Sequence, residues 1–128
     1  MQTRKIIIAD LSMDFALRII NMYKYLCNEK AEYIISKQLL RSGTSIGANI
    51  AESEHAQSKA DFISKLYIAL KESNETKYWI TLLVKSEYIT ETQHDSIIKD
   101  LRIIIGTLVN IIKKTKNKEE EEEEEKIG

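Results

Sequence analysis

The segment QLLRSGTSIGANIAE, from Gln38 to Glu52, places two glycines four residues apart within a stretch that otherwise has the pattern of a long helix. Serine, threonine and alanine fill most of the positions around them. Glycine costs about 1 kcal/mol relative to alanine in a helix interior, so its presence needs a compensating reason. The segment therefore predicts that another backbone packs very close to this helix, through Gly43, Gly47, Ala48 and Ala51.

The composition indicates one domain built from a few long helices. The 128 residues include no proline and only four glycines, which is too few for a fold with a turn every 8 to 12 residues. Hydrophobic residues make up 43% and charged residues 30%, as in ordinary soluble domains.

Apolar residues recur at steps of three and four in four segments, which predicts four helices that each bury one face. The expected inner positions are Leu11, Phe15, Ile19, Met22 and Leu26; Ile35, Leu39, Gly43, Ile46 and Ile50; Phe62, Leu66, Ala69, Leu70, Ser73, Ile80 and Val84; and Ile97, Leu101, Ile104, Leu108 and Ile111. Short connections between such helices favour an all-α fold, an antiparallel up-down-up-down four-helix bundle. Residues 1–118 are expected to form this bundle domain.

Two of the expected helix starts carry capping signals. Ser58 and Asp61 resemble a capping box with Asp in place of Glu, and Thr90 and Gln93 form a full box by residue type. Before the first helix, the β-branched stretch from Arg4 to Ala9 is expected to form a short extended arm along the bundle.

Charge is distributed unevenly along the chain. Seven consecutive glutamates run from Glu119 to Glu125, and such a block of like charge predicts a disordered acidic tail over residues 119–128. Up to Lys118 the chain contains 18 Lys plus Arg and 13 Asp plus Glu, which gives this part a formal charge of +5. The bundle is therefore mildly basic, although the whole chain has a net charge of −1.

A cytoplasmic location is expected, without a membrane partner. Cys27 is the only cysteine, which excludes an intrachain disulfide and disfavours an extracellular scaffold. The apolar run from Ile6 to Ala9 is too short for a signal sequence, and no stretch has the 18 apolar residues of a membrane span.

Apolar residues outside the inner stripes predict self-association. On the third helix, Ile68, Trp79 and Leu83 fall outside the expected core face, and the second helix presents a smooth face of small residues. A bulky face and a smooth face suit contacts between subunits, and the alternative is a wide helix that covers more of its own core. A heterologous contact closes as a ring and an isologous contact makes a dimer, so the pattern leaves the number of subunits open.

Two segments of the sequence have the ligand spacing of di-metal helical bundles. Glu52 and His55 have the Glu-x-x-His spacing of such sites, and so do Glu91 and His94. The first pair ends the second helix and the second pair begins the fourth, so the antiparallel arrangement separates them by about 35 to 40 Å. No bound metal is expected.

Catalytic arrangements are not expected either. Cys27 lies at the polar end of the first helix, with no reason for a histidine beside it. Glu72 and Glu75 are expected to pair with lysines of a neighbouring helix. A phosphate-binding loop and a dinucleotide fingerprint are both missing from the sequence. The chain is therefore predicted not to be an enzyme and to need no cofactor.

A nucleic acid is the main alternative partner. Basic residues cluster near the end of the fourth helix, at Lys113, Lys114, Lys116 and Lys118. Further candidates for basic patches are Arg4, Lys5, Arg41 and Arg102. Oligomerisation would repeat these charges and increase the affinity for RNA or DNA, whereas the adjacent glutamates would compete for the same surface.

Three segments carry a resemblance to a known family: DLSMDFALRI from Asp10 to Ile19, the segment from Gln38 to Glu52, and AQSKADFISKLYIALKESNETKYWITLL from Ala56 to Leu83. They resemble the small bacterial four-helix-bundle proteins named after intervening sequences in 23S ribosomal RNA genes. The resemblance covers nearly everything from Ile6 to Ile112, and the poly-glutamate tail is not part of it. It implies a homopentamer of four-helix bundles without catalytic residues.

A related branch, the accessory variability proteins of diversity-generating retroelements, forms a pentameric barrel that binds a reverse transcriptase and nucleic acid. That branch is markedly basic, and this chain departs from it through its weaker charge and acidic tail. Together, the residues and the resemblance predict a non-enzymatic homo-oligomeric scaffold or interaction protein. The alternative is a nucleic-acid-binding accessory protein with a reverse transcriptase as its partner.

Overall fold

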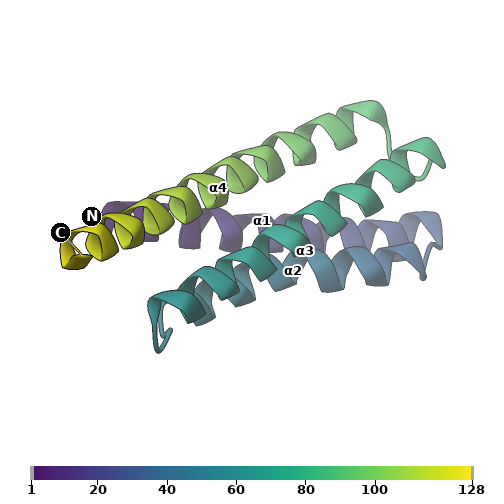
Figure 1. Ribbon diagram of the computed structural model, residues 1–128. Coiled ribbons are helices and arrows are strands. Elements are labelled where there is room, and N and C mark those ends of the chain that lie inside the picture. The colour runs from purple at the N-terminus through teal and green to yellow at the C-terminus, as the bar shows by residue number, and fades with distance from the viewer. Residues whose placement is uncertain (1, 128) are drawn as a thin grey trace.

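The computed structural model describes the backbone of residues 2–127 and the side chains of residues 7–127, which form four helices joined by short turns (Figure 1). The helices are α1 (Gln2–Lys30), α2 (Ile35–Ser53), α3 (Lys59–Lys85) and α4 (Glu91–Ile127). Each helix packs against the next in chain order, and α4 closes the bundle against α1. Both termini lie at the same end, as in an antiparallel up-down-up-down bundle.

The first helix begins earlier than its sequence pattern indicates. The extended arm expected from Arg4 to Ala9 is wrong, because this segment forms part of α1. Ile8 is only 3% exposed and joins the common core of the bundle. Burial of Ile8 outweighs the slightly lower helix propensity of β-branched residues, which is a weak preference of about a few tenths of a kcal/mol.

The caps predicted for α3 and α4 are confirmed, and α4 has the full box with both bonds, whereas the Asp61 carboxylate of α3 accepts from the N–H of Gln57 and not of Ser58. Ser58 Oγ accepts a hydrogen bond from the N–H of Asp61 at 3.0 Å. The N–H of Gln93 donates to Thr90 Oγ1 at 3.1 Å, and the N–H of Thr90 donates to Gln93 Oε1 at 2.8 Å. These bonds satisfy backbone donors that have no partner within the helix, so each helix begins at its cap.

The start of α2 has a cap that no sequence motif announced. The carboxylate of Glu32 accepts hydrogen bonds from the N–H groups of Ile34, Ile35 and Ser36, at 3.2, 3.1 and 2.7 Å. Glu32 is 7% exposed, so these three bonds replace the water that its charge would otherwise require. A negative charge at this position also interacts favourably with the helix dipole.

The core of α3 follows a coiled-coil seam with alternating steps of three and four residues. Its seam positions are Leu66, Ala69, Ser73, Thr76, Ile80 and Leu83. Thr76 is fully buried and donates to Ser42 Oγ of α2 at 2.9 Å, while Ser73 donates to the carbonyl of Ala69 at 2.8 Å. The polar seam positions are therefore satisfied by bonds inside the bundle.

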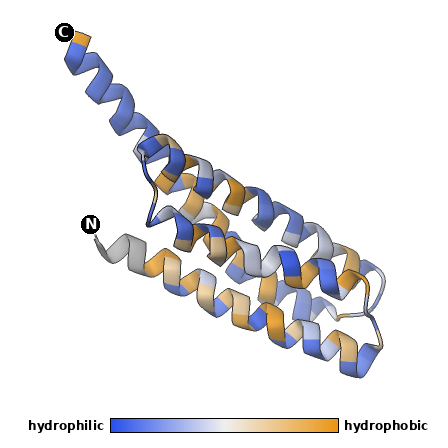
Figure 2. Cartoon of the chain, turned by 90° about the horizontal axis from the view of Figure 1, so that it is seen from below, coloured by the Kyte–Doolittle hydropathy of each residue, from blue (hydrophilic) through white to orange (hydrophobic). Residues whose placement is uncertain are grey.

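The acidic end of the chain is helical rather than disordered. Residues 119–127, predicted as part of a disordered tail, continue α4 as far as Ile127, and Gly128 lies outside the described residues. Figure 2 shows this end projecting beyond the other helices, hydrophilic except at its tip. Lysine–glutamate pairs four residues apart, such as Lys118 and Glu122, support the helical form. Within residues 2–127, no helix combines the length and apolar character that a membrane crossing requires.

Candidate functional site

The two glycines of α2 face α1 within the same chain. A Cβ atom at Gly43 would lie 2.7 Å from Ile19 Cγ1 and 2.8 Å from Ile19 Cγ2. At Gly47, a Cβ atom would lie 3.4 Å from Ser12 Oγ, which is close to an ordinary contact. Gly43 therefore permits an approach of the two helices that alanine would obstruct, whereas the requirement at Gly47 is weaker.

The two alanines predicted beside these glycines lie on the outside of the protomer. Ala48 and Ala51 are exposed and line an apolar groove of about 280 Å³ between α1 and α2. Met13, at the edge of this groove, is 63% exposed, and Leu17, one turn further along α1, is 53% exposed. We call this surface the α1–α2 groove; it is an apolar strip that the protomer itself leaves exposed.

The three residues predicted at subunit contacts have different positions in the protomer. Ile68 is 39% exposed, and Trp79 is half-buried against the core. Eleven residues, three helical turns, separate them, so they share one outward face of α3. The assignment of Leu83 is wrong, because its side chain is 0% exposed and fills the last position of the α3 seam.

A charged network joins α2 to this outward face of α3. Arg41 Nη1 lies 3.0 Å from Glu72 Oε2, and Arg41 Nη2 pairs with Glu75. Trp79 Nε1 donates to Glu75 Oε2 at 3.1 Å, so the network also orients the indole. The lysine partners expected for these glutamates are wrong, since an arginine serves both. The Glu72 side chain is only 10% exposed, which makes Arg41 its main electrostatic compensation.

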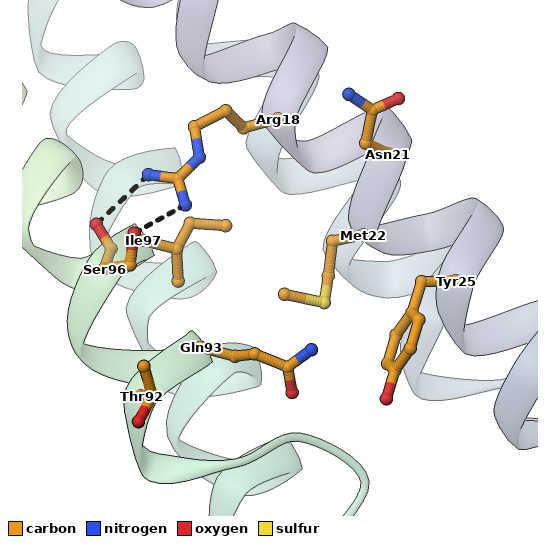
Figure 3. A pocket seen from close by; sticks show the side chains of 8 residues that line it. All are labelled: Arg18, Asn21, Met22, Tyr25, Thr92, Gln93, Ser96 and Ile97. Atoms are coloured by element: carbon orange, nitrogen blue, oxygen red, sulfur yellow. Dashed lines mark hydrogen bonds between the residues drawn. The ribbon is translucent and has the colours of Figure 1, made fainter.

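A pocket of about 440 Å³ opens between α1 and α4 (Figure 3). Arg18 reaches from α1 to α4, where it donates to the carbonyl of Ser96 at 3.1 Å, to Ser96 Oγ at 2.9 Å and to Asp100 Oδ2 at 2.7 Å. Met22 and Gln93 line the space below this bridge. Asp100 balances the charge of Arg18, so the bridge fastens two helices. No sequence motif predicted this bridge, because the partners are 82 residues apart.

The lysines of the basic run at the end of the bundle are exposed, and one of them, Lys116, also contacts α3. Lys113, Lys114 and Lys118 are exposed. Lys116 Nζ donates to Tyr67 Oη at 2.7 Å and lies 4.9 Å from the centre of its ring. This contact supports a cation–π interaction at the surface.

The other basic candidates do not gather around this run as one patch. Arg41 pairs with two glutamates, and Arg102 is exposed on α4. The side chains of Arg4 and Lys5 lie outside the described residues. The candidate surface for polyanions is therefore confined to the junction of α3 with the end of α4.

That junction is a groove of about 600 Å³, which we call the α3–α4 groove. Tyr67, Lys71 and Lys116 line it together with Glu119, the first residue of the acidic segment. One turn further, Lys59 at the start of α3 forms an ion pair with Glu122. Basic and acidic side chains of the same chain therefore face one another along this junction.

The two Glu-x-x-His pairs lie at opposite ends of the bundle (Figure 1). Glu52 and His55 are at the turn between α2 and α3, whereas Glu91 and His94 are at the start of α4. Glu91, His94 and Asp95 bring three possible ligand atoms within 4.8 Å of one another. They lie on one turn at the partly exposed end of a helix, so they differ from an inward-facing bundle site.

Cys27 lies beside hydroxyl groups. It is half-buried, with its Sγ 3.8 Å from Ser36 Oγ. A hydrogen bond between Tyr23 and Cys27, followed by their charge interaction, raises the pKa of Tyr23. A nucleophilic thiol needs a nearby base or cation, and neither neighbour supplies one at neutral pH.

Comparison with known proteins identifies the family. The model for the 23S rRNA-intervening sequence proteins matches residues 4–110. The chain belongs to the 23S rRNA-intervening sequence protein family. It is similar to the crystal structure of a protein of unknown function from the S23 ribosomal protein family of Bacteroides thetaiotaomicron. The two share 57% identity over 86% of this chain and 98% of that chain, with a TM-score of 0.85. No curated protein matches the chain.

The match to the 23S rRNA-intervening sequence proteins separates two parts of the surface. The α1–α2 groove and the Arg41 network lie within the matched residues. The basic run from Lys113 to Lys118 and the glutamates after it lie beyond residue 110, outside the family match. The α3–α4 groove thus combines a face of the family bundle with an extension of this chain.

Proposed function

We propose that this protein is a non-enzymatic, cytoplasmic scaffold or interaction protein that assembles from several copies of its four-helix bundle. The observation that carries the proposal is the exposed apolar strip along the α1–α2 groove. Met13 and Leu17 are more than half exposed beside Ala48 and Ala51. Contiguous apolar surface of this kind is typical of protein interfaces and uncommon on monomers.

The second half of the contact is the outward face of α3 that carries Ile68 and Trp79. This face and the α1–α2 groove lie on different sides of one protomer, because α3 packs against α2 and α4 but not against α1 in the described chain. A smooth groove and a bulky face in this arrangement favour a heterologous contact, which repeats around a closed ring. A pentamer is the ring that the resemblance to the family implies.

Light scattering of the purified protein tests this assembly. A pentamer has five times the 14.8 kDa mass of the chain. Met13→Asp and Ile68→Asp each place a charge in the proposed contact and should shift the protein to smaller species, because a buried unpaired charge is costly. Tyr33→Asp is a matched control, since Tyr33 is 56% exposed in the turn after α1. A monomeric wild type, or unchanged mass in both variants, would contradict the interface.

A nucleic-acid-binding role is a second candidate function, favoured by the α3–α4 groove. Tyr67 is 44% exposed, and Lys71 and Lys116 lie beside it. Aromatic rings beside cations are the recurring elements of single-strand binding, in which bases stack and phosphates pair with lysines. Ile68 lines the same groove, so RNA bound there would compete with the proposed subunit contact. A reverse transcriptase is the protein partner that the related retroelement branch suggests.

Fluorescence anisotropy with a labelled oligouridine RNA tests the second candidate. Binding should weaken steeply as the salt concentration rises from about 50 to 200 mM, because each phosphate contact releases counterions. Lys71→Gln together with Lys116→Gln, at two lysines that line the groove, should lower both the affinity and the salt dependence. If neither the wild type nor a variant with Glu119→Gln and Glu122→Gln binds the RNA at low salt, this candidate is wrong.

A further inference from the structure

The end of α4 brings an acidic segment of the chain onto its own basic groove. Glu119 lines the α3–α4 groove with Lys71 and Lys116, and it is only half-exposed. Glu122 is held one turn further by its ion pair with Lys59. These two glutamates are three residues apart, so they lie on the face of α4 that is directed toward α3.

The charges on the two sides of this junction stabilise one another. The contact with Tyr67 raises the pKa of Lys116, and Glu119 and Glu120 raise it further. The contact with Lys59 lowers the pKa of Glu122. Lys118 also contributes to this lowering. The shift in the pKa of Glu122 follows from its hydrogen bond and charge attraction to Lys59, which favour the ionised carboxylate, whereas the shift of Lys116 follows mainly from its hydrogen bond to Tyr67.

The acidic helix also has the charge density of a nucleic acid. A helix rises about 1.5 Å per residue, so consecutive glutamates place one negative charge about every 1.5 Å along its axis. Duplex DNA carries one charge per about 1.7 Å of its axis. Only the α3-facing side of this helix meets the lysines, so Glu119 and Glu122 are the charges that compete there with phosphates.

We propose that the acidic end of α4 is a built-in cover of the α3–α4 groove, which a single-stranded nucleic acid must displace in order to bind. The inference rests on the nucleic-acid-binding role proposed above and adds its regulation. When the acidic end is displaced, Lys59 loses its internal partner and Glu119 no longer competes for Lys71 and Lys116, while Tyr67, already 44% exposed, can stack with a base. The cover lowers the affinity of the full chain for RNA, because binding must first break the internal pairs.

Two matched double variants of the full chain test the cover. Glu119→Gln with Glu122→Gln removes the two charges that face α3. Glu121→Gln with Glu124→Gln changes the net charge equally and keeps the spacing, but at about 100° per residue these positions lie on the opposite side of α4. Circular dichroism and light scattering establish that helix content and assembly are the same in both.

Anisotropy with labelled oligouridine at about 50 mM salt gives the decisive comparison. The α3-facing pair should bind at least about fivefold more tightly than the opposite pair. Adding Tyr67→Ala to the α3-facing pair should reverse most of this gain, because the released surface loses its stacking ring. That result would support the cover.

The outcomes distinguish the cover from the binding role itself. Equal affinity of the two double variants would show that only net charge matters, which would overturn the cover while RNA binding stands. A gain that persists with Tyr67→Ala would place the binding surface elsewhere and would also overturn it. Failure of the wild type and of all variants to bind would overturn both the nucleic-acid-binding role and its cover.

Discussion

Gly43 of α2 lies against Ile19 of α1 so closely that a Cβ atom on the glycine would come within 2.7 Å of Ile19 Cγ1. Ile19 is 0% exposed, so its side chain has little space into which it can move. The close approach of α1 and α2 therefore depends on the missing side chain at this position, and it explains why a helix tolerates glycine there.

Gly43→Ala should lower the free energy of unfolding by about 1–2 kcal/mol, since overpacking of about 1–3 kcal/mol exceeds the gain in helix propensity. Gly106→Ala is the matched control, because a Cβ atom at Gly106 in α4 would have no atom within 4 Å beyond its chain neighbours and the adjacent backbone of its own helix. It should stabilise by about 0.5–1 kcal/mol. Urea denaturation at one fixed protein concentration measures both. Equal signs for the two substitutions would contradict the packing explanation.

Two helix ends contain residues with left-handed backbone conformations, Ala31 with φ of 50° and Glu87 with φ of 66°. Ala31→Gly and Glu87→Gly should each stabilise by about 0.5–1 kcal/mol, because glycine adopts this conformation without strain from a Cβ atom. Glu29→Gly, in the last turn of α1, should instead destabilise by about 0.5 kcal/mol, because this residue is still helical. Thermal unfolding of the three variants checks the contrast, and loss of stability at Ala31 and Glu87 would refute it.

Arg41→Gln should destabilise the bundle by about 1–2 kcal/mol, because it leaves the Glu72 carboxylate with little solvent and without its cation. The expected loss is smaller than for a fully buried ion pair, because Arg41 is 50% exposed and solvent screens its charge. Glu72→Gln in the Arg41→Gln background should recover part of the loss. Denaturation monitored through Trp79, the only tryptophan, reports on both stability and the network.

The control for this network is Lys59→Gln, which removes an exposed ion pair and should change stability by less than about 0.5 kcal/mol. A double-mutant cycle between Arg41 and Glu72 should give a favourable coupling energy. Coupling indistinguishable from zero would mean that the two charges do not stabilise the contact between α2 and α3.

Acidification should release the end of α4 from α3. The pKa of Glu122 is lowered by Lys59, so their ion pair contributes fully above the ordinary glutamate pKa of 4.5 and is lost as the pH falls through the lowered value. Protonation of the other glutamates removes their mutual repulsion, so helix content should not fall with the contact. Carboxyl NMR titration should show the pKa of Glu122 returning toward 4.5 in Lys59→Gln. An unchanged titration would rule out the pair.

The sequence predicts those features of the fold that depend on only a few neighbouring residues. The bonds between Thr90 and Gln93 need only four consecutive residues, and the predicted box is present with both bonds. The apolar periodicity likewise predicts four helices, and the structure has four helices in the corresponding segments of the chain. The start of α1 was missed because its helical form depends on burial of Ile8 in the core, which no local propensity reveals.

The candidate surfaces were harder to predict because a helix pattern does not say which side faces which neighbour. Leu83 lay outside the stripe expected from the sequence, yet the 3–4 seam of α3 buries it completely. Arg41 and Glu72 are 31 residues apart, and Lys59 and Glu122 are 63 apart, so their pairing depends on the packed bundle. The α1–α2 and α3–α4 grooves arise only between helices.

The amino-acid order by itself determined the number of helices, the caps of α3 and α4 and the need for a glycine within α2, because each depends on spacing along one backbone. The tertiary structure decided which apolar residues remain exposed, which carboxylates meet which cations, and where the acidic end of α4 comes to rest. Those outcomes depend on distances between separate helices, and such distances exist only after the chain has folded.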